Sequence, residues 1–300
     1  MRARRKKPSG ARNPNEAFSI VLHGPSAKVS VRNGKVVRAV ILSDLHFPFE
    51  DPSAMTLARA ILEDADPHLI ILNGDLVDFY GISSFPKDPL RQAQFAAELE
   101  KDKEKIHRLL SWAPDIPWIY LEGNHERRLL YHLWKRTPEF AGSPLLRIPS
   151  IFELPENVIY LSQVHEPRAR HEFVAPQVQL SKLYIMHGDL IRGSRGAINI
   201  ARSILLKLLQ SVLVGHHHTI QSYTQSKHDG TISGAWVVGC LCFQRPHFDA
   251  GRIWAQGIAV VSAERRFFEP EVIPFIHKDK QLVAMWRGRR YACPANTRSW

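Results

Sequence analysis

Five short apolar segments of this chain are each followed at once by side chains that bind metal ions. The five blocks are Asp44-Leu-His46, Gly74-Asp75-Leu-Val-Asp78, Gly123-Asn124-His125-Glu126, His187-Gly-Asp189 and Gly215-His216-His217-His218. Imidazole and carboxylate groups with one amide suit Mn, Fe, Zn, Co or Ni, rather than Ca or a metal held by thiolates. The blocks therefore predict a metal site with mixed oxygen and nitrogen ligands.

The spacing inside the blocks supports this interpretation. Asp44 and His46 stand two residues apart, as do His216 and His218, so both members of each pair can point the same way near a strand end. His217 should then face elsewhere. Glycines stand beside the ligands in four blocks, where the backbone must turn sharply and approach a substrate closely.

The elements that position these blocks alternate between strand and helix. Apolar runs predict strands at 39–43, 68–73, 118–121, 182–186 and 211–214. Helical spacing of apolar residues predicts helices at 53–64, 90–112, 125–136 and 197–209. This alternation predicts an α/β layered fold. In α/β sheets, ligands collect at the carboxyl ends of strands, where the loops converge, and all five blocks stand at such ends.

Two further regions predict antiparallel strands. Residues 28–42 contain the turn signal Asn33-Gly34 between two apolar runs, which predicts a hairpin. Apolar runs at 220–226, 232–241, 253–262 and 272–275 predict an antiparallel block. We expect this block to form a second sheet packed on the first.

The chain predicts one domain with a basic segment at each end. Neither an internal repeat nor a linker occurs between 35 and 276, so we expect a single domain at 17–276, a disordered arm at 1–16 and a basic tail at 277–300. No apolar run approaches the ~20 residues of a membrane span. The basic N-terminus is not followed by the apolar stretch of a secretory signal. With three scattered cysteines there is no disulfide framework, and we expect a cytoplasmic protein without membrane association. The oligomeric state is left open.

The net charge of +11 is concentrated at the two ends. Residues 1–16 and residues 277–300 each contain six Arg or Lys and one acidic residue, which leaves the central body nearly neutral. Basic arms of this kind neutralise phosphates and add affinity for nucleic acid without sequence specificity. The alternative is a pair of solvated tails that only aid solubility.

The five blocks resemble the calcineurin-like metallophosphoesterase superfamily. Its pattern is D-x-H, G-D-x-x-D, G-N-H-[ED], a lone His and G-H-x-H, and all five parts occur here in that order from Asp44 to His218. A single block is a weak signal, but the ordered set is specific. The segments around 79–91, 124–133 and 187–195 resemble a branch of the superfamily found in bacteria and phages. The resemblance implies an α/β/β/α sandwich of two packed mixed β-sheets flanked by helices.

The resemblance also implies hydrolysis of a phosphoester by a hydroxide that two divalent metal ions activate, with manganese the leading candidate. Asp75 would bridge the two ions. The other ligands would be Asp44, His46 and His218 for the first ion, and Asn124, His187 and His216 for the second. His125 resembles the family's catalytic histidine, which binds the phosphate and protonates the leaving oxygen, with Asp78 hydrogen-bonded to it. Asn124 would also contact the substrate.

Other residues near the blocks have structural alternatives. Asp78 would instead cap a helix, and Asp189 would either orient a metal-bound imidazole or begin a loop. Since guanidinium binds phosphate oxygens bidentately, four arginines that follow the blocks are candidate phosphate clamps: Arg127, Arg128, Arg192 and Arg195. For the first two, the alternative is a helix position that reaches solvent or acidic neighbours.

One departure from the family pattern bears on the substrate. Protein Ser/Thr phosphatases and diadenosine tetraphosphatases of the superfamily continue the second block with a phosphate-binding Arg, where this chain has Phe79. The missing Arg, the full ligand set and the basic ends predict a phosphodiesterase of broad or nucleic-acid-related specificity. The alternatives are a phosphomonoesterase that acts on small metabolites or phosphoproteins, and a catalytically silent binding scaffold.

Overall fold

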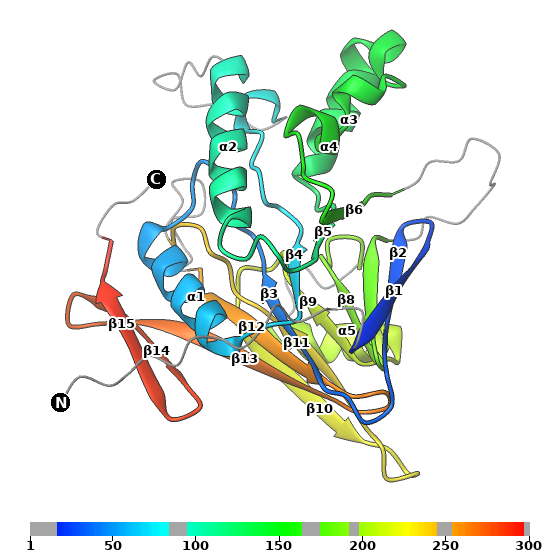
Figure 1. Cartoon of the computed structure of the whole chain (residues 1–300), viewed down its shortest axis with the longest axis vertical. Coiled ribbons are helices and arrows are strands. Elements are labelled where there is room, and N and C mark those ends of the chain that lie inside the picture. The colour runs from blue at the N-terminus through cyan, green and yellow to red at the C-terminus, as the bar shows by residue number, and fades with distance from the viewer. Residues whose placement is uncertain (1–16, 84–94, 164–174, 192–197, 245–253, 297–300) are drawn as a thin grey trace.

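The computed structural model describes residues 17–83, 95–163, 175–191, 198–244 and 254–296. Within these ranges two β-sheets of mixed strand direction pack face to face, and helices cover the outer face of each sheet (Figure 1). The predicted α/β fold with two packed mixed sheets is confirmed. None of the described helices is long and apolar enough to cross a membrane.

One sheet has eight described strands in the order β15-β14-β13-β12-β3-β4-β5-β6. Its parallel half consists of β3 Val37–Leu42, β4 Leu69–Asn73, β5 Trp118–Leu121 and β6 Val158–Leu161. Its antiparallel half consists of β12 Gln256–Ala263, β13 Phe268–Lys278, β14 Gln281–Trp286 and β15 Arg289–Pro294. Strand β12 joins the halves by pairing with β3. The central strands are almost wholly apolar because both of their faces are covered.

The other sheet has seven described strands in the order β1-β2-β7-β8-β9-β11-β10. Its strands are β1 Phe18–His23, β2 Ser26–Val31, β7 Gln177–Leu180, β8 Leu183–Met186, β9 Val212–Val214, β10 Gln221–Ser226 and β11 Ile232–Val237. Strands β8 and β9 are parallel, so they end at the same edge of the sheet.

The helices lie outside the sheets. The eight-stranded sheet is covered by α1 Pro52–Ala65, α2 Phe95–Leu110, α3 Glu126–Arg136 and α4 Ile148–Ile151, with short 3-10 turns η2 Tyr80–Ile82, η3 Pro138–Phe140 and η4 Pro144–Leu146. The seven-stranded sheet is covered by α5 Ile200–Leu208. Helix α1 starts where it does because the Asp51 carboxylate accepts the N–H of Ser53 at 2.8 Å and Pro52 occupies its first turn.

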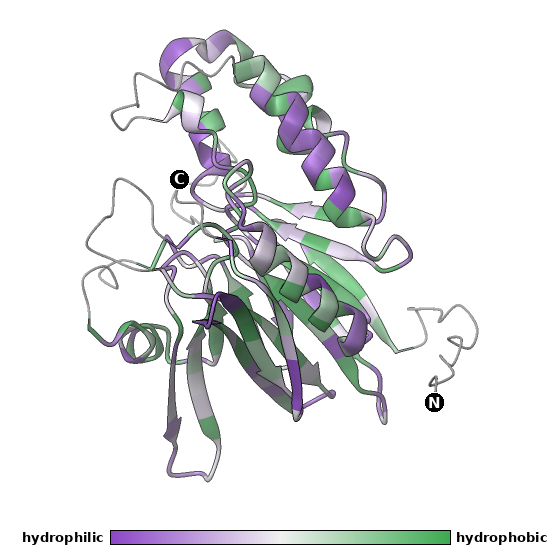
Figure 2. Cartoon of the chain, turned by 90° about the vertical axis from the view of Figure 1, so that its left-hand side faces the viewer, coloured by the Kyte–Doolittle hydropathy of each residue, from purple (hydrophilic) through white to green (hydrophobic). Residues whose placement is uncertain are grey.

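The main core lies between the sheets. Buried aliphatic side chains from the two facing surfaces interdigitate there, among them Val29, Leu180, Ile185 and Leu213 from one sheet and Ile41, Ile71, Ile119 and Val261 from the other. Figure 2 shows hydrophobic residues concentrated along the strands and hydrophilic residues on the outer parts of the helices. This packing fixes both sheets relative to each other, and with them the loops that follow their strands.

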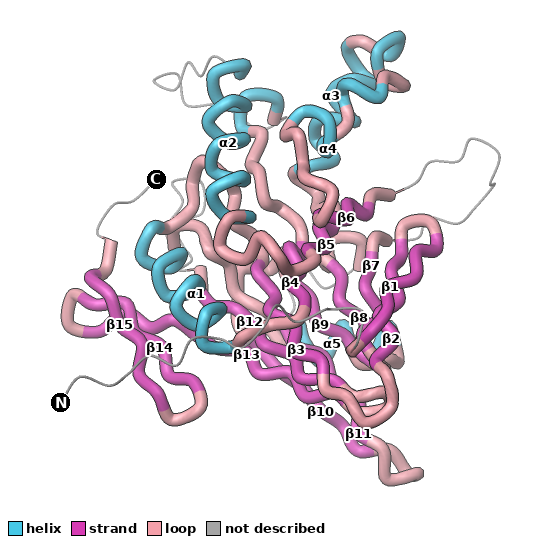
Figure 3. The backbone as a smooth tube through the Cα atoms, in the orientation of Figure 1, coloured by secondary structure: helices cyan, strands magenta, loops and turns pink. Residues whose placement is uncertain are grey.

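The prediction that residues 277–300 form a tail is wrong for the residues up to 294. Strands β14 and β15 form a hairpin at the edge of the eight-stranded sheet beside α1 (Figure 3). Leu282 and Trp286 are buried, and the Tyr291 hydroxyl donates to the Asp64 carboxylate of α1 at 2.7 Å. The folded domain therefore extends beyond the predicted boundary. The predicted disordered arm at 1–16 lies outside the described residues.

The predicted hairpin at 28–42 is also wrong. Strand β2 pairs with β1 and β7 in one sheet, whereas β3 pairs with β4 and β12 in the other. Asn33-Gly34 instead lies in the turn that connects the two sheets, with Gly34 at φ +71°. The predicted antiparallel block after residue 220 is likewise divided, since β10 and β11 belong to the seven-stranded sheet and β12 and β13 to the other.

Candidate metal centre

The five predicted ligand blocks meet at one place in the structure. They follow β3, β4 and β5 of the eight-stranded sheet and β8 and β9 of the seven-stranded sheet. Within each sheet these strands are parallel, so their carboxyl ends lie along one edge. The two edges adjoin, and each sheet contributes side chains to the same cluster.

The backbone at the cluster is strained. Positive φ angles occur at five of the predicted ligands: Asp44 (55°), His46 (52°), Asp75 (51°), His216 (63°) and His218 (49°). Such conformations cost on the order of 1–3 kcal/mol for residues other than glycine, and they concentrate at functional sites. Hydrogen bonds between the loops hold them, since the His46 N–H donates to the Asp75 carbonyl at 2.9 Å.

Two glycines allow the loops to approach this closely. A Cβ atom at Gly74 would lie 2.5 Å from the His187 ring, and one at Gly123 would overlap the Asp75 carboxylate. Any side chain at these positions would push a predicted ligand away from the cluster. The expectation that glycine permits a close approach beside the ligands is met at both positions.

The first group of donor atoms consists of Asp44, His46, His218 and Asp75. Asp44 Oδ1 lies 3.1 Å from His218 Nε2 and 3.9 Å from His46 Nε2. The two imidazole nitrogens are 3.2 Å apart, and Asp75 Oδ2 lies 3.9 Å from His46 Nε2. These are the four residues predicted to hold the first ion.

The second group consists of Asp75, Asn124, His187 and His216. His187 Nε2 lies 3.1 Å from Asp75 Oδ2 and 3.2 Å from Asn124 Oδ1. The ligand atoms of Asp75, His187 and His216 all lie within 4.8 Å of one another. These are the residues predicted to hold the second ion together with the bridging Asp75.

The protonation states of Asp44, His46 and His216 suit metal binding. Burial alone would raise the pKa of the Asp44 carboxyl, but His218 beside it lowers that pKa well below the usual range. Burial lowers the pKa of His46 to about 4 and that of His216 to about 2. Metal ligation needs ionised carboxylates and neutral imidazoles.

The chemistry of this donor set fits a divalent cation. Asp44, Asp75 and Asp78 are buried close together, and buried carboxylates need compensating positive charge. In the metal-free chain that charge falls partly on His187, because Asp75 outweighs the effect of burial and raises the pKa of His187 to about 10.

Neighbouring groups fix the orientation of the imidazoles. The His187 ring meets the Asn73 carbonyl at 2.8 Å through Nδ1; with the proton on Nδ1, the ring donates there and turns Nε2 toward the cluster. His46 Nδ1 lies 3.1 Å from Asp78 Oδ2. Partners of this kind set the tautomer and the direction of a metal-binding histidine.

Glu126 organises the loops from behind, a role that the sequence analysis did not assign. Its buried carboxylate accepts the backbone N–H groups of Asp75 at 3.0 Å, Leu76 at 2.7 Å and Gly123 at 2.8 Å, and the Tyr120 hydroxyl at 2.7 Å. The acidic position of the G-N-H-[ED] block was a signal for this residue, but Asp75 and Leu76, two of its partners, lie about 50 positions away in sequence.

His125 and Asp78 lie together as predicted. His125 Nδ1 is 3.1 Å from Asp78 Oδ2, and His125 Nε2 is 3.7 Å from Asp75 Oδ2. Burial lowers the pKa of His125, but Asp75 and Asp78 outweigh it and raise that pKa above the usual value. Asp78 also contacts His46, so its side chain serves the cluster and does not cap a helix.

Two of the four candidate phosphate clamps, Arg127 and Arg128, lie in the described residues, and their surroundings differ. Arg127 is buried and forms ion pairs with Asp189 and Glu122, which favours the alternative of acidic neighbours over a phosphate clamp. Asp189, the last residue of the His187 block, therefore forms an ion pair with Arg127. Arg128 points to the cluster, with Nη2 2.9 Å from His125 Nε2. Arg192 and Arg195 lie outside the described residues.

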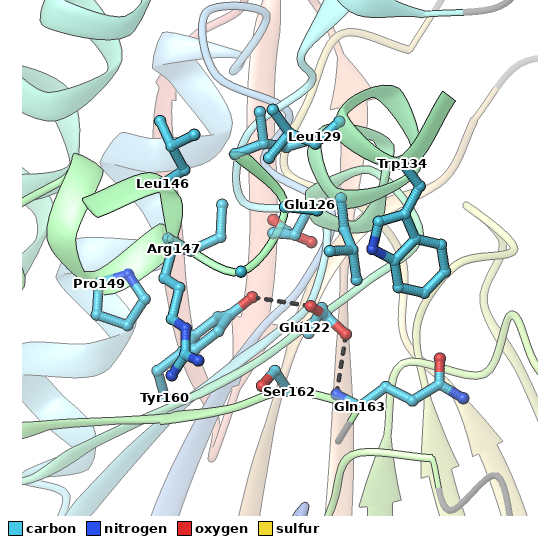
Figure 4. Close-up of a pocket in the computed structure, with 15 residues that line it drawn as sticks. Glu122, Glu126, Leu129, Trp134, Leu146, Arg147, Pro149, Tyr160, Ser162 and Gln163 are labelled. Atoms are coloured by element: carbon cyan, nitrogen blue, oxygen red, sulfur yellow. Dashed lines mark hydrogen bonds between the residues drawn. The ribbon is translucent and has the colours of Figure 1, made fainter. Parts of the chain in front are cut away.

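A separate cavity of about 790 Å³ lies on the other side of α3 (Figure 4). Leu129, Leu133 and Trp134 of α3 line it together with Leu146, and Glu122 and Tyr160 form its polar side. The Tyr160 hydroxyl and the Gln163 N–H both donate to Glu122, at 3.2 and 3.0 Å. This cavity is mainly apolar and contains none of the predicted ligands.

Comparison with known proteins places these residues in a family. Calcineurin-like phosphoesterase sequences match residues 37–239, which contain all five blocks. The Gene 54 protein of Mycobacterium phage L5 is 23% identical over 252 residues, which cover 80% of this chain and 94% of that protein. The Gene 54 protein of Mycobacterium phage D29 is also 23% identical, over 257 residues, with the same coverage.

Solved structures of low sequence identity are also similar. Yfce, a phosphoesterase from E. coli, has 12% identity and a TM-score of 0.33, and covers 86% of this chain and 100% of that one. Purple acid phosphatase PPD1 from yellow lupin has 14% identity and a TM-score of 0.41, and covers 83% of this chain and 53% of that one. Because the family match spans more than half of the chain and contains the whole ligand cluster, this protein belongs to the calcineurin-like phosphoesterase family.

Proposed function

We propose that this chain is a phosphodiesterase that works with two divalent metal ions, with manganese the first candidate. One observation carries the proposal. Asp75 Oδ2 is shared by both donor groups, at 3.9 Å from His46 Nε2 and 3.1 Å from His187 Nε2. A carboxylate placed between two sets of ligands is the arrangement that a dinuclear centre requires.

When bound, the two cations supply Lewis-acid polarisation of the phosphoryl oxygens and lower the pKa of the attacking water. The chain supplies the positioning. Asp44, His46 and His218 would hold one cation, Asn124, His187 and His216 the other, and Asp75 both. The loop strain and the contacts of Asn73 and Asp78 keep these side chains aimed at one point before any ligand arrives.

His125 is the group best placed to protonate the leaving oxygen. Its ring is 13% exposed at the edge of the cluster and is oriented by Asp78. The raised pKa keeps the ring protonated nearer to neutral pH, as a general acid requires. Arg128, beside the same edge of the ring, can bind a phosphoryl oxygen with its remaining N–H groups.

The preference for a diester rests on the number of basic side chains that lie beside the cluster. Phe79, at the position of the family's phosphate-binding Arg, is buried and packs against Phe95 and Phe152. The described basic side chain that lies against His125 is Arg128, with Nη2 2.9 Å from His125 Nε2. A monoester carries one more negative charge than a diester and benefits more from a second cation, so this arrangement supports the diester.

Hydrolysis of bis-p-nitrophenyl phosphate and of p-nitrophenyl phosphate by the manganese-loaded protein tests the proposal. Asp75→Asn keeps the side-chain size and should abolish turnover, and His125→Ala should reduce it by about 10²- to 10⁴-fold. Glu139→Gln, an exposed change on the adjacent η3 turn, is the matched control. Turnover of the diester that depends on Asp75 supports the proposal.

The rival functions give different results. Turnover of the monoester alone would assign a phosphomonoesterase. Silence on both substrates with metal bound in stoichiometric amounts would favour a binding scaffold.

Nucleic-acid binding through the basic ends remains a proposal of its own. Deletion of residues 1–16 tests the first arm. Deletion of residues 277–300 does not test the second basic end cleanly, because it also removes β14 and β15 from the sheet.

A further inference from the structure

A stripe of basic and aromatic side chains leads along α3 away from the metal centre. Arg128, Tyr131 and Lys135 follow His125 at intervals of three, three and four residues, which places them on one face of the helix. The stripe begins at the cluster itself, since Arg128 Nη2 lies 2.9 Å from His125 Nε2. Farther along, Tyr131 and Lys135 are exposed.

Tyr131 of this stripe lies beside the ring of Trp134, which stands next to the stripe on α3. The Tyr131 and Trp134 ring centroids are 5.6 Å apart, and the two residues are 48% and 39% exposed. Trp134 also lines the cavity on the other side of α3, where Figure 4 shows its ring at the rim. Large aromatic rings that are partly exposed on the helix that begins at the metal centre suit the stacking of a flat ligand.

The excess of basic side chains around the two rings favours an anionic ligand. Residues 127–147 contain five basic residues and one acidic residue, Glu139. Arg127 is neutralised in the interior by Asp189 and Glu122, whereas Lys135, Arg136 and Arg147 are exposed. A ligand that is both a polyanion and a series of flat rings matches this surface.

We propose that α3 binds a single-stranded nucleic acid and guides it into the metal centre. Arg128 and Lys135 contact its phosphates, while Tyr131 and Trp134 stack on its bases. At 1.5 Å per residue the stripe is about 10 Å long, which corresponds to a short run of nucleotides. A duplex keeps its bases stacked inside and cannot offer them to the rings. The inference rests on the proposed phosphodiesterase function and names its substrate class.

The test is binding of fluorescein-labelled oligothymidylate to the full chain with Asp75→Asn, measured by fluorescence anisotropy. Tyr131→Ala and Trp134→Ala should each weaken binding about tenfold, whereas Tyr131→Phe and Trp134→Phe should retain most of it. Lys135→Ala should reduce the slope of log affinity against log salt by about 0.7. Phe267→Ala, which removes an aromatic ring that is 63% exposed, and Lys182→Ala, an exposed lysine, are matched controls and should bind normally.

Affinity that does not change in Tyr131→Ala and Trp134→Ala would overturn the inference. A dimer seen by sedimentation, broken by Trp134→Ala and without oligonucleotide binding, would also overturn it and make the stripe a contact between copies. The two proposals can fail separately. Ring-dependent binding without hydrolysis of any diester by the wild-type chain keeps this inference and rejects the activity. Hydrolysis of bis-p-nitrophenyl phosphate without ring-dependent binding does the reverse.

Discussion

The Arg128 guanidinium contacts His125 and Asp78 at once. Its Nη2 lies 2.9 Å from His125 Nε2, and its Nη1 donates to the Asp78 backbone carbonyl at 2.8 Å. Among the effects of neighbouring charges on His125, Asp75 and Asp78 raise its pKa and Arg128 lowers it. Arg128 therefore tunes the proposed general acid as well as offering N–H groups to a phosphate.

Replacing Arg128 should change the pH dependence of turnover. A general acid works while it is protonated, so activity falls as pH rises through its pKa. Arg128→Gln removes the cation that opposes Asp75 and Asp78, so the alkaline limb of kcat/KM should move to higher pH, while the maximum falls about tenfold. Arg108→Gln, on the exposed face of α2, is the control. A limb at the wild-type pH would show that Arg128 does not act on His125.

Metal removal should lower thermal stability. A ligand that binds only the folded state adds about 2.7 kcal/mol to the free energy of unfolding at 100 times its Kd. We expect EDTA to reduce Tm and added manganese to restore it, as measured by differential scanning fluorimetry. Asp75→Asn, which alters the shared ligand, should lose this response. A response to manganese that is the same in Asp75→Asn would contradict the placement of the metal.

Loss of the Glu126 carboxylate should destabilise the whole centre. Glu126→Ala leaves several buried N–H groups without an acceptor, each at a cost of about 1–3 kcal/mol. We expect a loss of at least about 3 kcal/mol in the free energy of unfolding by urea, together with weaker metal binding. Glu139→Ala, exposed on the nearby η3 turn, should be neutral. Equal urea midpoints for the two variants would refute this role.

The last hairpin should be required for stability. Deletion of residues 277–300 removes the buried side chains of Leu282 and Trp286 and the contact of Tyr291 with Asp64. At about 1.5–3 kcal/mol for each buried large side chain, the loss should be several kcal/mol and should lower soluble yield. Deletion of residues 297–300 should have little effect. A truncated chain as stable as the full one would restore the view of this segment as a tail.

Asp102 should make stability depend on pH. This residue of α2 is buried, and neither of its carboxylate oxygens has a hydrogen-bond partner among the described residues. Burial and the nearby Glu98 raise the pKa of Asp102 to about 8. Between about pH 4 and 8 the folded chain then holds a proton that the unfolded chain lacks, so this group reduces stability as pH rises. Asp102→Asn should raise Tm relative to wild type at pH 8 but not at pH 5, whereas exposed Asp115→Asn should not. A constant difference at both pH values would contradict the assignment.

The clustering of the predicted ligands was the most predictable feature of the molecule. Each block has a local signature, an apolar strand that ends in Asp, His or Asn, and the order of the blocks fixes which side chains meet. The hydrogen-bond and ion-pair partners of residues beside the cluster were harder to predict. Glu126 and Arg127 were visible in the sequence, but their roles depend on residues about 50 to 60 positions away, which no local pattern specifies.

The predictions of the strand connections were wrong for a different reason. Asn33-Gly34 is a strong local turn signal, but β2 pairs with β1 and β7 while β3 pairs with β4 and β12, and these partners are not specified by the turn. In the last hairpin, Leu282, Ala284 and Trp286 alternate as a strand should. The basic residues before and after them suggested a solvated tail, although Arg289 pairs with Asp64 of α1.

The division of the ligands between two sheets ties cation affinity to the docking of the two halves of the molecule. His187, His216 and His218 follow strands of one sheet, whereas Asp44, His46, Asp75 and Asn124 follow strands of the other. Two cations bound by these side chains would therefore hold the two sheets together. By thermodynamic reciprocity, a change that weakens the packing of the sheets should also weaken metal binding. Leu213→Ala would create a cavity in the core between the two sheets and should lower the affinity for metal, although Leu213 is not one of the predicted ligands.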